Sequence, residues 1–224
     1  MADKTIYSEN IMRLCAIAAL LCLAVPVMAD PVPFDKSWKT QRFSLFSSNK
    51  YGFEGQVMTI ASNGSVSLAY APVKEALWGS KSASWGWQVS QTVPATDLSL
   101  KGGDDRNASL YFVFLPEAEA KALGGKADVR KLLTNEAARV LVYVWGDDRD
   151  RGTVLSSPYL GARGKTILLR GVGTGAFAEK VDLVADYKRI FNAEPGALVG
   201  LAVSADSDDT DTVIRARITE LSLN

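Results

Sequence analysis

Apolar and polar residues alternate along much of this chain with the period of two that is typical of β-strands. Between residues 66 and 70 every second residue is Val, Leu or Tyr, and the residues between them are Ser or Ala. Trp85, Trp87 and Val89 share one face in the same way. An antiparallel strand with one buried face shows this alternation. The dipeptide Asn63-Gly64 precedes the first of these strands and predicts a tight hairpin.

Later apolar segments predict further strands, and a helical interruption separates them. The predicted strands cover residues 110–115, 139–145, 166–170, 177–184, 198–204 and 212–223. After Pro116 the pattern changes to helical spacing, and Asp128 is a candidate N-cap for a second short helix. A short helical insertion is therefore expected at about residues 116–138. Roughly ten short strands with few helices predict an all-β fold, an antiparallel sandwich or barrel.

The N-terminal segment has the features of an export signal. An almost unbroken apolar run from Leu14 to Met28 ends in a small-x-small pattern at Ala29. The run has about 15 residues, fewer than the roughly 20 that a spanning helix needs. Residues 1–29 are therefore predicted to be a signal peptide, with Met12 as an alternative start. A single domain would follow over residues 30–224, periplasmic or secreted, with no membrane span after signal removal.

The amino-acid composition limits the disulfide, catalytic and metal-binding chemistry that the domain could have. Both cysteines, Cys15 and Cys22, fall inside the predicted signal, so the domain is expected to hold no disulfide. The chain has no histidine, which excludes Ser-His-Asp and Cys-His catalysis and histidine metal sites. Acid–base chemistry would fall to carboxylates, Lys or Tyr, and a bound metal would need oxygen ligands.

Charge excludes one class of partner. Lys and Arg together number 25, Asp and Glu also number 25, and no block of basic residues occurs along the chain. Proteins that bind nucleic acid concentrate positive charge against the phosphates. Nucleic acid is therefore not expected as a partner.

Two acidic loops are the main candidates for a site. One carries Asp97, Asp104 and Asp105, and the other covers residues 206–211 after a predicted strand. We expect the two loops to lie side by side on one rim of the sandwich. Carboxylates crowded in this way repel one another unless a cation lies among them. Lys101 and Arg106 are the local candidates for that positive charge.

The second loop invites a metal prediction. Asp206, Asp208 and Asp211 alternate with small polar residues, and such oxygens can surround calcium. An EF-hand is excluded, because Asp211 and Arg217 stand where that motif requires Gly and Glu. The alternative is a turn whose Asp side chains accept hydrogen bonds from nearby backbone N–H groups.

Aromatic residues allow two interpretations. Trp85 and Trp87, and likewise Trp145, could form a flat platform on which a sugar ring stacks. Tryptophans that alternate with β-branched residues are also typical of a sandwich core, and the core interpretation is favoured.

Two acids, one in a predicted strand and one in a loop, allow an enzymatic alternative. A glycosidase needs two carboxylates about 5–10 Å apart across the bond that it cleaves. Glu179 and Asp97 could form such a pair, although nothing in the sequence requires it.

Several motifs in a fixed order resemble a bacterial exported family catalogued as domain of unknown function 3047. The motifs are Trp85-x-Trp87-x-Val89, Pro94-x-Thr96-Asp97-Leu98, Asp104-Asp105, Tyr111 to Phe114, Tyr143-Val144-Trp145, Asp186-Tyr187 with Phe191, and Asp206-x-Asp208-x-Thr210. The resemblance implies a periplasmic jelly-roll-like sandwich similar to carbohydrate-binding and galactose-binding-like modules, with no established activity. Ser109 stands where the family usually has an arginine, so a family arginine–acid pair is expected to be missing.

Together these features predict an exported β-sandwich that binds a carbohydrate or other cell-envelope ligand and is not an enzyme. The predicted ligand-binding residues are Trp85, Trp87, Asp97, Asp104, Asp105, Trp145, Glu179, Asp206, Asp208 and Thr210, and a bound cation is expected to be calcium. The alternatives are a glycan-active enzyme that uses Asp and Glu as general acid and base, and a structural partner in an envelope complex.

Overall fold

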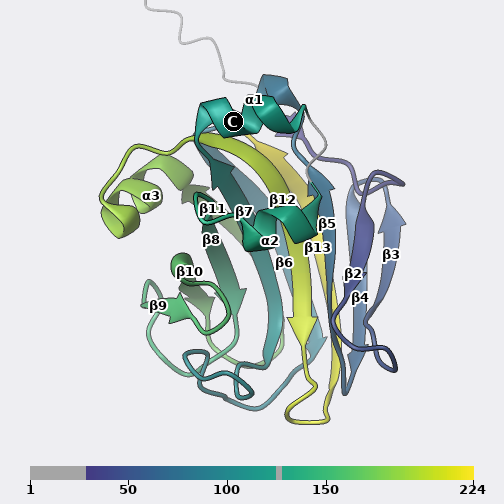
Figure 1. Ribbon diagram of the computed structural model, residues 1–224. Coiled ribbons are helices and arrows are strands. Elements are labelled where there is room, and N and C mark those ends of the chain that lie inside the picture. Colours follow the sequence, from purple (N-terminus) through teal and green to yellow (C-terminus); the bar gives the residue numbers. More distant parts are fainter. Residues whose placement is uncertain (1–28, 125–127) are drawn as a thin grey trace, which may run out of the picture.

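Two β-sheets lie face to face in the computed structural model, which describes residues 29–124 and 128–224 (Figure 1). The six-stranded sheet has the order β11 (Gly175–Asp182), β6 (Ser82–Gln91), β13 (Val213–Leu223), β4 (Val57–Asn63) and β3 (Lys50–Glu54), and β1 (Asp30–Pro31) pairs with β13. The seven-stranded sheet has the order β2 (Lys39–Arg42), β5 (Val66–Pro72), β12 (Ala197–Asp206), β7 (Arg106–Leu115), β8 (Arg139–Trp145), β10 (Gly161–Arg170) and β9 (Val154–Ser157). The prediction of an all-β sandwich is confirmed.

The sheets are antiparallel with one exception. β10 pairs with β8 in parallel, and the chain between them first forms β9, which pairs with β10 in the antiparallel sense. The hairpin predicted at Asn63-Gly64 is wrong: this turn carries the chain from β4 in the six-stranded sheet to β5 in the seven-stranded sheet, and the two strands do not pair. Gly64 has a φ of 54°, which glycine adopts at little cost. The signal peptide predicted for residues 1–29 lies almost entirely outside the described residues.

Three α-helices and one short 3₁₀ helix, η1 (Glu75–Leu77), occur in the described parts of the chain. The helical insertion predicted near residues 116–138 contains α1 (Glu117–Leu123) and α2 (Val129–Thr134), and the Asp128 side chain caps α2 as expected. α3 (Leu183–Phe191) begins where the predicted strand 177–184 was expected to end. No described helix is long and apolar enough to cross a membrane.

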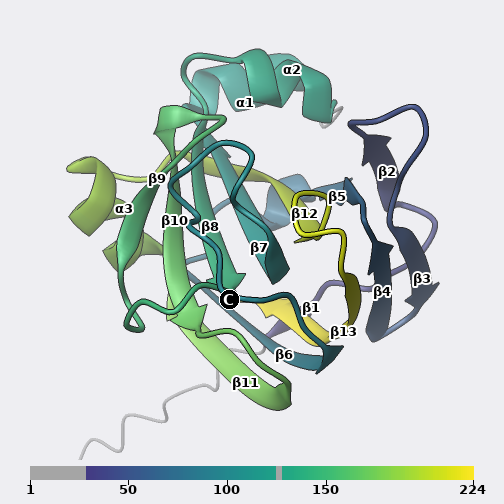
Figure 2. The ribbon, with the colours of Figure 1, turned by 90° about the horizontal axis from the view of Figure 1, so that it is seen from below.

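Helices α1 and α2 lie across the outer face of the seven-stranded sheet, as the view along the sandwich shows (Figure 2). Val129 of α2 packs with Leu68 and Ala202, and Leu132 packs with Val199. These contacts explain why the outward-facing residues of this sheet are apolar. The sequence pattern of β7, apolar on both faces, therefore reflects a sheet that is covered on both sides.

The tryptophans lie in the core between the sheets. Trp85 and Trp87 are each 2% exposed, and their ring centroids are 5.5 Å apart in an edge-on arrangement. Trp145 is 1% exposed and lies 5.5 Å from Trp87. Rings enclosed in this way cannot offer a face to a sugar, so the platform interpretation of Trp85, Trp87 and Trp145 is wrong for this conformation. Their role is to fill a core that has no disulfide to support it.

We predict that Trp87→Ala lowers the free energy of unfolding by about 3–5 kcal/mol, because the truncated side chain leaves a cavity among rigid neighbours. Phe46, which is 97% exposed, is the control, and Phe46→Ala should change stability by less than about 0.5 kcal/mol. Urea denaturation measures both. Equal effects in the two variants would contradict the core assignment.

Candidate functional site

A cavity of about 480 Å³ lies on the outer face of the seven-stranded sheet. Its floor is formed by β5, β12, β7 and β8, and α2 covers one side. Residues 157–160, which follow β9, and Phe43, which follows β2, complete its walls. This volume falls within the roughly 300–1,000 Å³ typical of small-molecule sites.

Most of the lining is apolar. The apolar and aromatic side chains that contribute are Phe43, Val66, Leu68, Tyr70, Leu98, Tyr111, Val113, Val129, Leu132, Leu133, Val140, Val142, Tyr159 and Leu160. Several of them, including Val66, Tyr70 and Val113, are only half-buried. The cavity therefore exposes an apolar surface that the protein itself does not cover.

One end of the cavity is polar. Asp104, Arg106, Asp206 and Asp208 line it there, and Ser204 lies beside them on β12. Asp104 and Asp206 are 3% and 4% exposed. Charges buried this deeply are costly unless they are paired, so the contacts of each group decide what the site can do.

A β-bulge places Arg106 in this cavity. Ala108, Leu110 and Phe112 of β7 face the core, so regular alternation would direct Arg106 inward as well. Between the pairs Ser204↔Ser109 and Asp206↔Arg106, β7 contains one more residue than β12. The extra residue reverses the alternation, which is how a bulge redirects a side chain. Arg106 thereby stands opposite Asp206 on the cavity side of the sheet.

The Arg106 guanidinium joins most of the polar end. Its Nη1 lies 2.8 Å from Asp104 Oδ2 and 3.2 Å from Asp206 Oδ2. Its Nη2 donates to Tyr111 Oη at 2.9 Å, and its Nε donates to Ser109 Oγ at 3.3 Å. An arginine–acid pair is thus present although Ser109 stands where the family arginine was expected, and Arg106 is its cation. Of the two candidate cations, Lys101 and Arg106, it is Arg106 that lies among the acids.

Asp104 has partners on both oxygens. Arg106 binds Oδ2, and Tyr159 donates its hydroxyl to Oδ1 at 3.0 Å. Burial, followed by the charge of Asp104, raises the pKa of Tyr159 to about 12. The phenol therefore keeps its proton at neutral pH and acts as a donor to the carboxylate.

Asp206 is only partly satisfied. Arg106 contacts Oδ2, whereas no donor within the described residues reaches the buried Oδ1. Burial is the largest cause that raises the pKa of Asp206, to about 8. Arg106 lowers this pKa, and the neighbouring Asp208 and Asp104 raise it. At neutral pH the Asp206 carboxyl is therefore mostly protonated next to Asp208.

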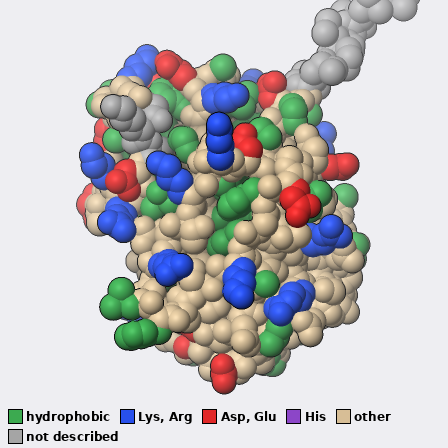
Figure 3. Space-filling view, turned by 90° about the vertical axis from the view of Figure 1, so that its right-hand side faces the viewer, with side chains coloured by type: hydrophobic (Ala, Val, Ile, Leu, Met, Phe, Trp, Pro, Cys, Tyr) green, Lys and Arg blue, Asp and Glu red, His purple; other side chains and the backbone are tan. Residues whose placement is uncertain are grey.

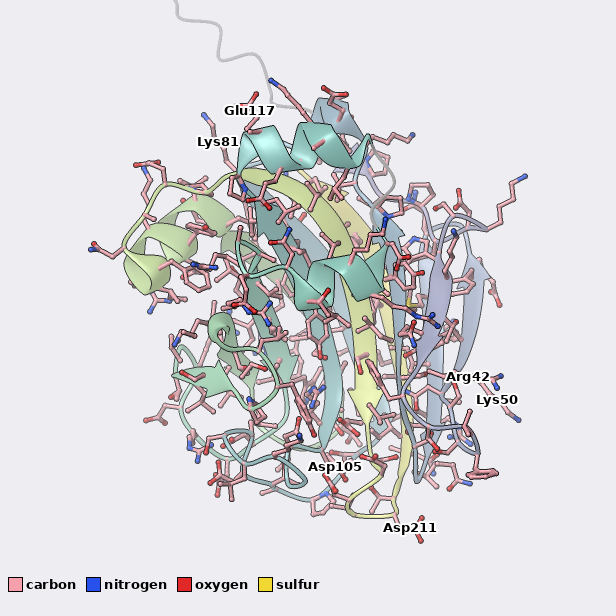
Figure 4. All side chains as sticks on the ribbon, in the orientation of Figure 1. Arg42, Lys50, Lys81, Asp105, Glu117 and Asp211 are labelled. Carbon is pink, nitrogen blue, oxygen red and sulfur yellow. The ribbon has the colours of Figure 1, made fainter. Side chains whose placement is uncertain are left out.

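The two acidic loops meet at this end of the sandwich. The backbone N–H of Thr210 donates to Asp105 Oδ2 at 2.8 Å, and the backbone N–H of Asp209 donates to Oδ1 at 3.3 Å. Asp105 and Asp211 lie at the same end of the molecule in Figure 4. The expectation that loops far apart in sequence become neighbours is confirmed. Asp105 and Thr210, however, bind each other and do not line the cavity.

The carboxylates that could hold a metal differ from the predicted set. Oxygens of Asp105, Asp208 and Asp209 lie within 4.8 Å of one another. The predicted set was Asp206, Asp208 and Asp211, but Asp211 has a φ of 49° in the turn and lies against Gly64. Only Asp208 belongs to both sets. Calcium binding therefore stays a prediction, and an acidic cluster of this kind is common on surfaces without an ion.

The expected acid pair Asp97 and Glu179 is not part of the cavity lining. Asp97 pairs with Arg149 at 2.8 Å, and hydrogen bonds from Ser99 and Arg149 lower its pKa to about 2. Glu179 lies on β11 and is held by Arg170 and Arg151, with the Trp87 indole N–H donating to it. Each acid is engaged by its own arginines, so they do not form a catalytic pair across this cavity.

Several cavity residues gave no functional signal in the sequence. Tyr111 was counted as part of an apolar strand, and Tyr159 lies in a loop to which no role was given. Their convergence on Arg106 and Asp104 depends on the β7 bulge and on the chain that follows β9. Tyr111 lies near the start of an apolar run, and nothing in the sequence around it indicates its contact with Arg106.

We predict that the stability of the protein falls as pH rises from about 4 to about 8. The ordinary pKa of Asp is 3.8, so between pH 4 and 8 the folded chain holds a proton on Asp206 that the unfolded chain has released. Stability must therefore decrease with pH in that window. No histidine titrates there, because the chain has none. Urea denaturation at several pH values should show a shallower slope for Asp206→Asn.

The control for this experiment is Asp211→Asn, a change in the same loop outside the cavity. It should keep the slope of the unaltered protein. An identical slope in the Asp206→Asn protein would show that the carboxyl titrates with its ordinary pKa.

Comparisons with solved structures find distant likenesses. The chain is similar to the xyloglucanase domain of NopAA, a type three effector from Sinorhizobium fredii in complex with cellobiose. The identity is 6% and the TM-score 0.43, over 89% of this chain and 99% of that one. It is also similar to the winged bean acidic lectin complexed with methyl-α-D-galactose, at 11% identity and a TM-score of 0.38, over 88% and 100% of the two chains.

A loop-swap mutant of Xyn11A from "Necallimastix patriciarum" is a third similar structure, at 10% identity and a TM-score of 0.35, over 84% and 99% of the two chains. TM-scores below 0.5 carry no argument about what this chain binds. No curated protein matches the sequence. The model of the family described as "Protein of unknown function (DUF3047)" matches residues 31–222, and the chain belongs to this family.

Proposed function

We propose that this protein is a binding protein for a small amphipathic ligand, which occupies the cavity on the outer face of the seven-stranded sheet. The observation that supports this most directly is the composition of the lining. A long apolar surface leads to one compact polar end, where Asp104, Arg106 and Asp206 are buried. A ligand with an apolar body and one polar group matches both parts.

The apolar part supplies the affinity in this proposal. Val66, Tyr70 and Val113 are half-buried, and their side chains line the cavity between the sheet and α2. Covering such a surface releases about 25 cal/mol for each Å² of apolar area removed from water. Large exposed apolar patches on soluble proteins commonly mark binding sites.

The other sheet offers a useful contrast. A second depression, on the six-stranded sheet, is lined by Lys50, Thr59, Gln88, Arg215 and Arg217 together with Tyr51, Ile60, Ala61 and Ala216. No acidic residue of the described chain lines it, in contrast to the acidic polar end of the cavity. Figure 3 shows the edge of the sandwich at β2 and β3, where Lys and Arg side chains are spread over the surface.

The source of the ligand follows from the predicted export signal. If residues 1–29 direct the chain to the periplasm or the outside, the ligand comes from the cell envelope or from the surrounding medium. Amphipathic molecules are abundant there. The periplasmic location and the signal peptide are parts of this proposal.

A carbohydrate is the second candidate ligand. The rings of Tyr70, Tyr111 and Tyr159 line the cavity, and Asp206 Oδ1 offers an acceptor for a hydroxyl group. Sugar rings stack on aromatic faces through their apolar C–H surfaces. The glycan-cleaving alternative has less support, because the expected pair Asp97 and Glu179 does not line this cavity.

We predict that N-phenyl-1-naphthylamine, a neutral apolar fluorophore, binds in the cavity and brightens saturably. Val113→Trp fills the middle of the floor and should weaken this binding about tenfold, the effect of about 55 Å² of lost apolar contact. Gln88→Trp, the same new side chain on the exposed face of β6, is the matched control and should leave the affinity unchanged. Fluorescence titration measures all three proteins.

Two results would count against the amphipathic ligand. One is the absence of saturable brightening, and the other is equal weakening by Val113→Trp and Gln88→Trp. Either would show that the fluorophore does not report on this cavity.

The carbohydrate alternative has its own test. A glycan array of envelope sugars, run with and without a chelator, should give a signal that Val113→Trp removes. A signal that the chelator alone removes would support the calcium prediction. No signal from any envelope sugar would leave the amphipathic, non-sugar ligand as the better description.

A further inference from the structure

We propose that the polar end of the cavity binds a cationic group of the ligand, an ammonium or a similar hydrogen-bond donor, with Asp206 as its counter-ion. This inference rests on the proposed amphipathic ligand and specifies its head group. It follows from the balance of charge at the polar end, from the contacts of Arg106 and from the unsatisfied oxygen of Asp206.

The charge balance of the lining is negative. Asp104, Asp206 and Asp208 line the cavity, and even with Asp206 protonated the other two carboxylates outnumber Arg106, the only cationic side chain among the lining residues. Asp105 and Asp209 lie just beyond Asp208 and add to the negative field. Lys101 is outside the lining, with its Nζ 5.5 Å from the centre of the Tyr159 ring. A ligand that brings positive charge is therefore favoured over one that brings negative charge.

Arg106 is not available to bind an anion. Its Nη1 contacts the carboxyl groups of Asp104 and Asp206, its Nη2 donates to Tyr111, and its Nε donates to Ser109. A carboxylate or phosphate on the ligand would have to displace these buried partners. Removing a partner from a buried charge pair is costly. The fatty-acid-like ligand that a lone buried arginine suggests is thus disfavoured.

Asp206 Oδ1 is the acceptor that lacks a donor. The residue is 4% exposed, and no described group donates to Oδ1. Leaving such an atom unpaired costs about 1–3 kcal/mol or more when the group is charged. A ligand ammonium in the cavity would supply both the missing N–H donor and a positive charge that offsets the neighbouring acids.

The strand geometry fits a ligand that extends away from this point. Asp206, Ser204, Ala202 and Gly200 alternate along β12 on the cavity side and change from acidic to apolar. Alternate residues of a strand are about 6.6–6.8 Å apart. A head group at Asp206 would therefore place an alkyl chain along Ala202 and Gly200, towards Leu132 of α2.

A series of ligands with the same tail tests the head group. We would titrate the full chain with decylamine, 1-decanol and decanoate at pH 7 in the presence of EDTA, which keeps divalent cations off Asp105, Asp208 and Asp209. Decylamine should bind about tenfold or more tightly than decanoate, with decanol between them, as expected for a charge-assisted hydrogen bond. Displacement of N-phenyl-1-naphthylamine reports each affinity.

Substitution of the counter-ion should remove the preference. Asp206→Asn is expected to bring decylamine and decanol to nearly equal affinity, while Asp211→Asn, in the same loop, keeps the preference of the unaltered protein.

The outcomes separate the two proposals. Equal binding of the three head groups would overturn the cationic head group and keep the apolar cavity. Tighter binding of decanoate would assign the polar end to Arg106 instead. Failure of all three ligands to bind would overturn the proposed function itself.

Discussion

The buried guanidinium of Arg106 is the interaction on which the polar end of this structure depends. It joins Asp104, from the loop before β7, to Asp206, at the end of β12. Without it, two deeply buried carboxylates would repel each other in a medium of low polarity. The neighbouring loop contact, from the backbone of Thr210 to Asp105, forms beside this ion pair. Arg106 thus stabilises the arrangement in which the two acidic loops lie side by side at one end of the sandwich.

The placement of Arg106 in turn depends on one extra residue in β7. Without the bulge, its side chain would enter the core between the sheets, near Trp145 and the other aromatic rings. The bulge brings it instead to the outer face, which α2 and the chain after β9 cover in part. The same outer face is apolar further along β7 and β12. One local change in strand alternation therefore creates the boundary between the polar and apolar parts of the cavity.

The sequence predicted the strands well, because alternation reports directly on which residues face a core. It also predicted the helical insertion, the Asp128 cap and the meeting of the acidic loops, and it named Arg106, with Lys101, as a candidate cation between them. It did not predict the cavity. Strands such as β7, apolar on both faces, do not show whether their second face is sealed by helices or left open to a ligand. The parallel pairing of β10 with β8 was equally hidden, since register between distant strands leaves no local pattern.

The tryptophans and the acids illustrate two different limits. The alternation of Trp85 and Trp87 was compatible both with a sugar-stacking platform and with a sandwich core. Only the position of the second sheet, which covers these rings, decided for the core. For the acids the pattern located the loops but not the individual contacts: Asp105 became a structural acceptor, whereas Asp104 and Asp206 entered the cavity. Neighbours in sequence took different roles because adjacent residues of an extended chain point in opposite directions.

Asp206 shows why these contacts matter for function as well as for stability. A sequence selected only for stability would not keep a buried carboxyl with an unsatisfied oxygen next to a second carboxyl. Asn at this position could still accept a hydrogen bond from Arg106 and would carry no ionisable group. Departures from local consistency of this kind concentrate at functional sites, where the cost is offset when a ligand binds. Among the residues that line the cavity, Asp206 is the one whose chemistry is incomplete without a partner from outside the chain.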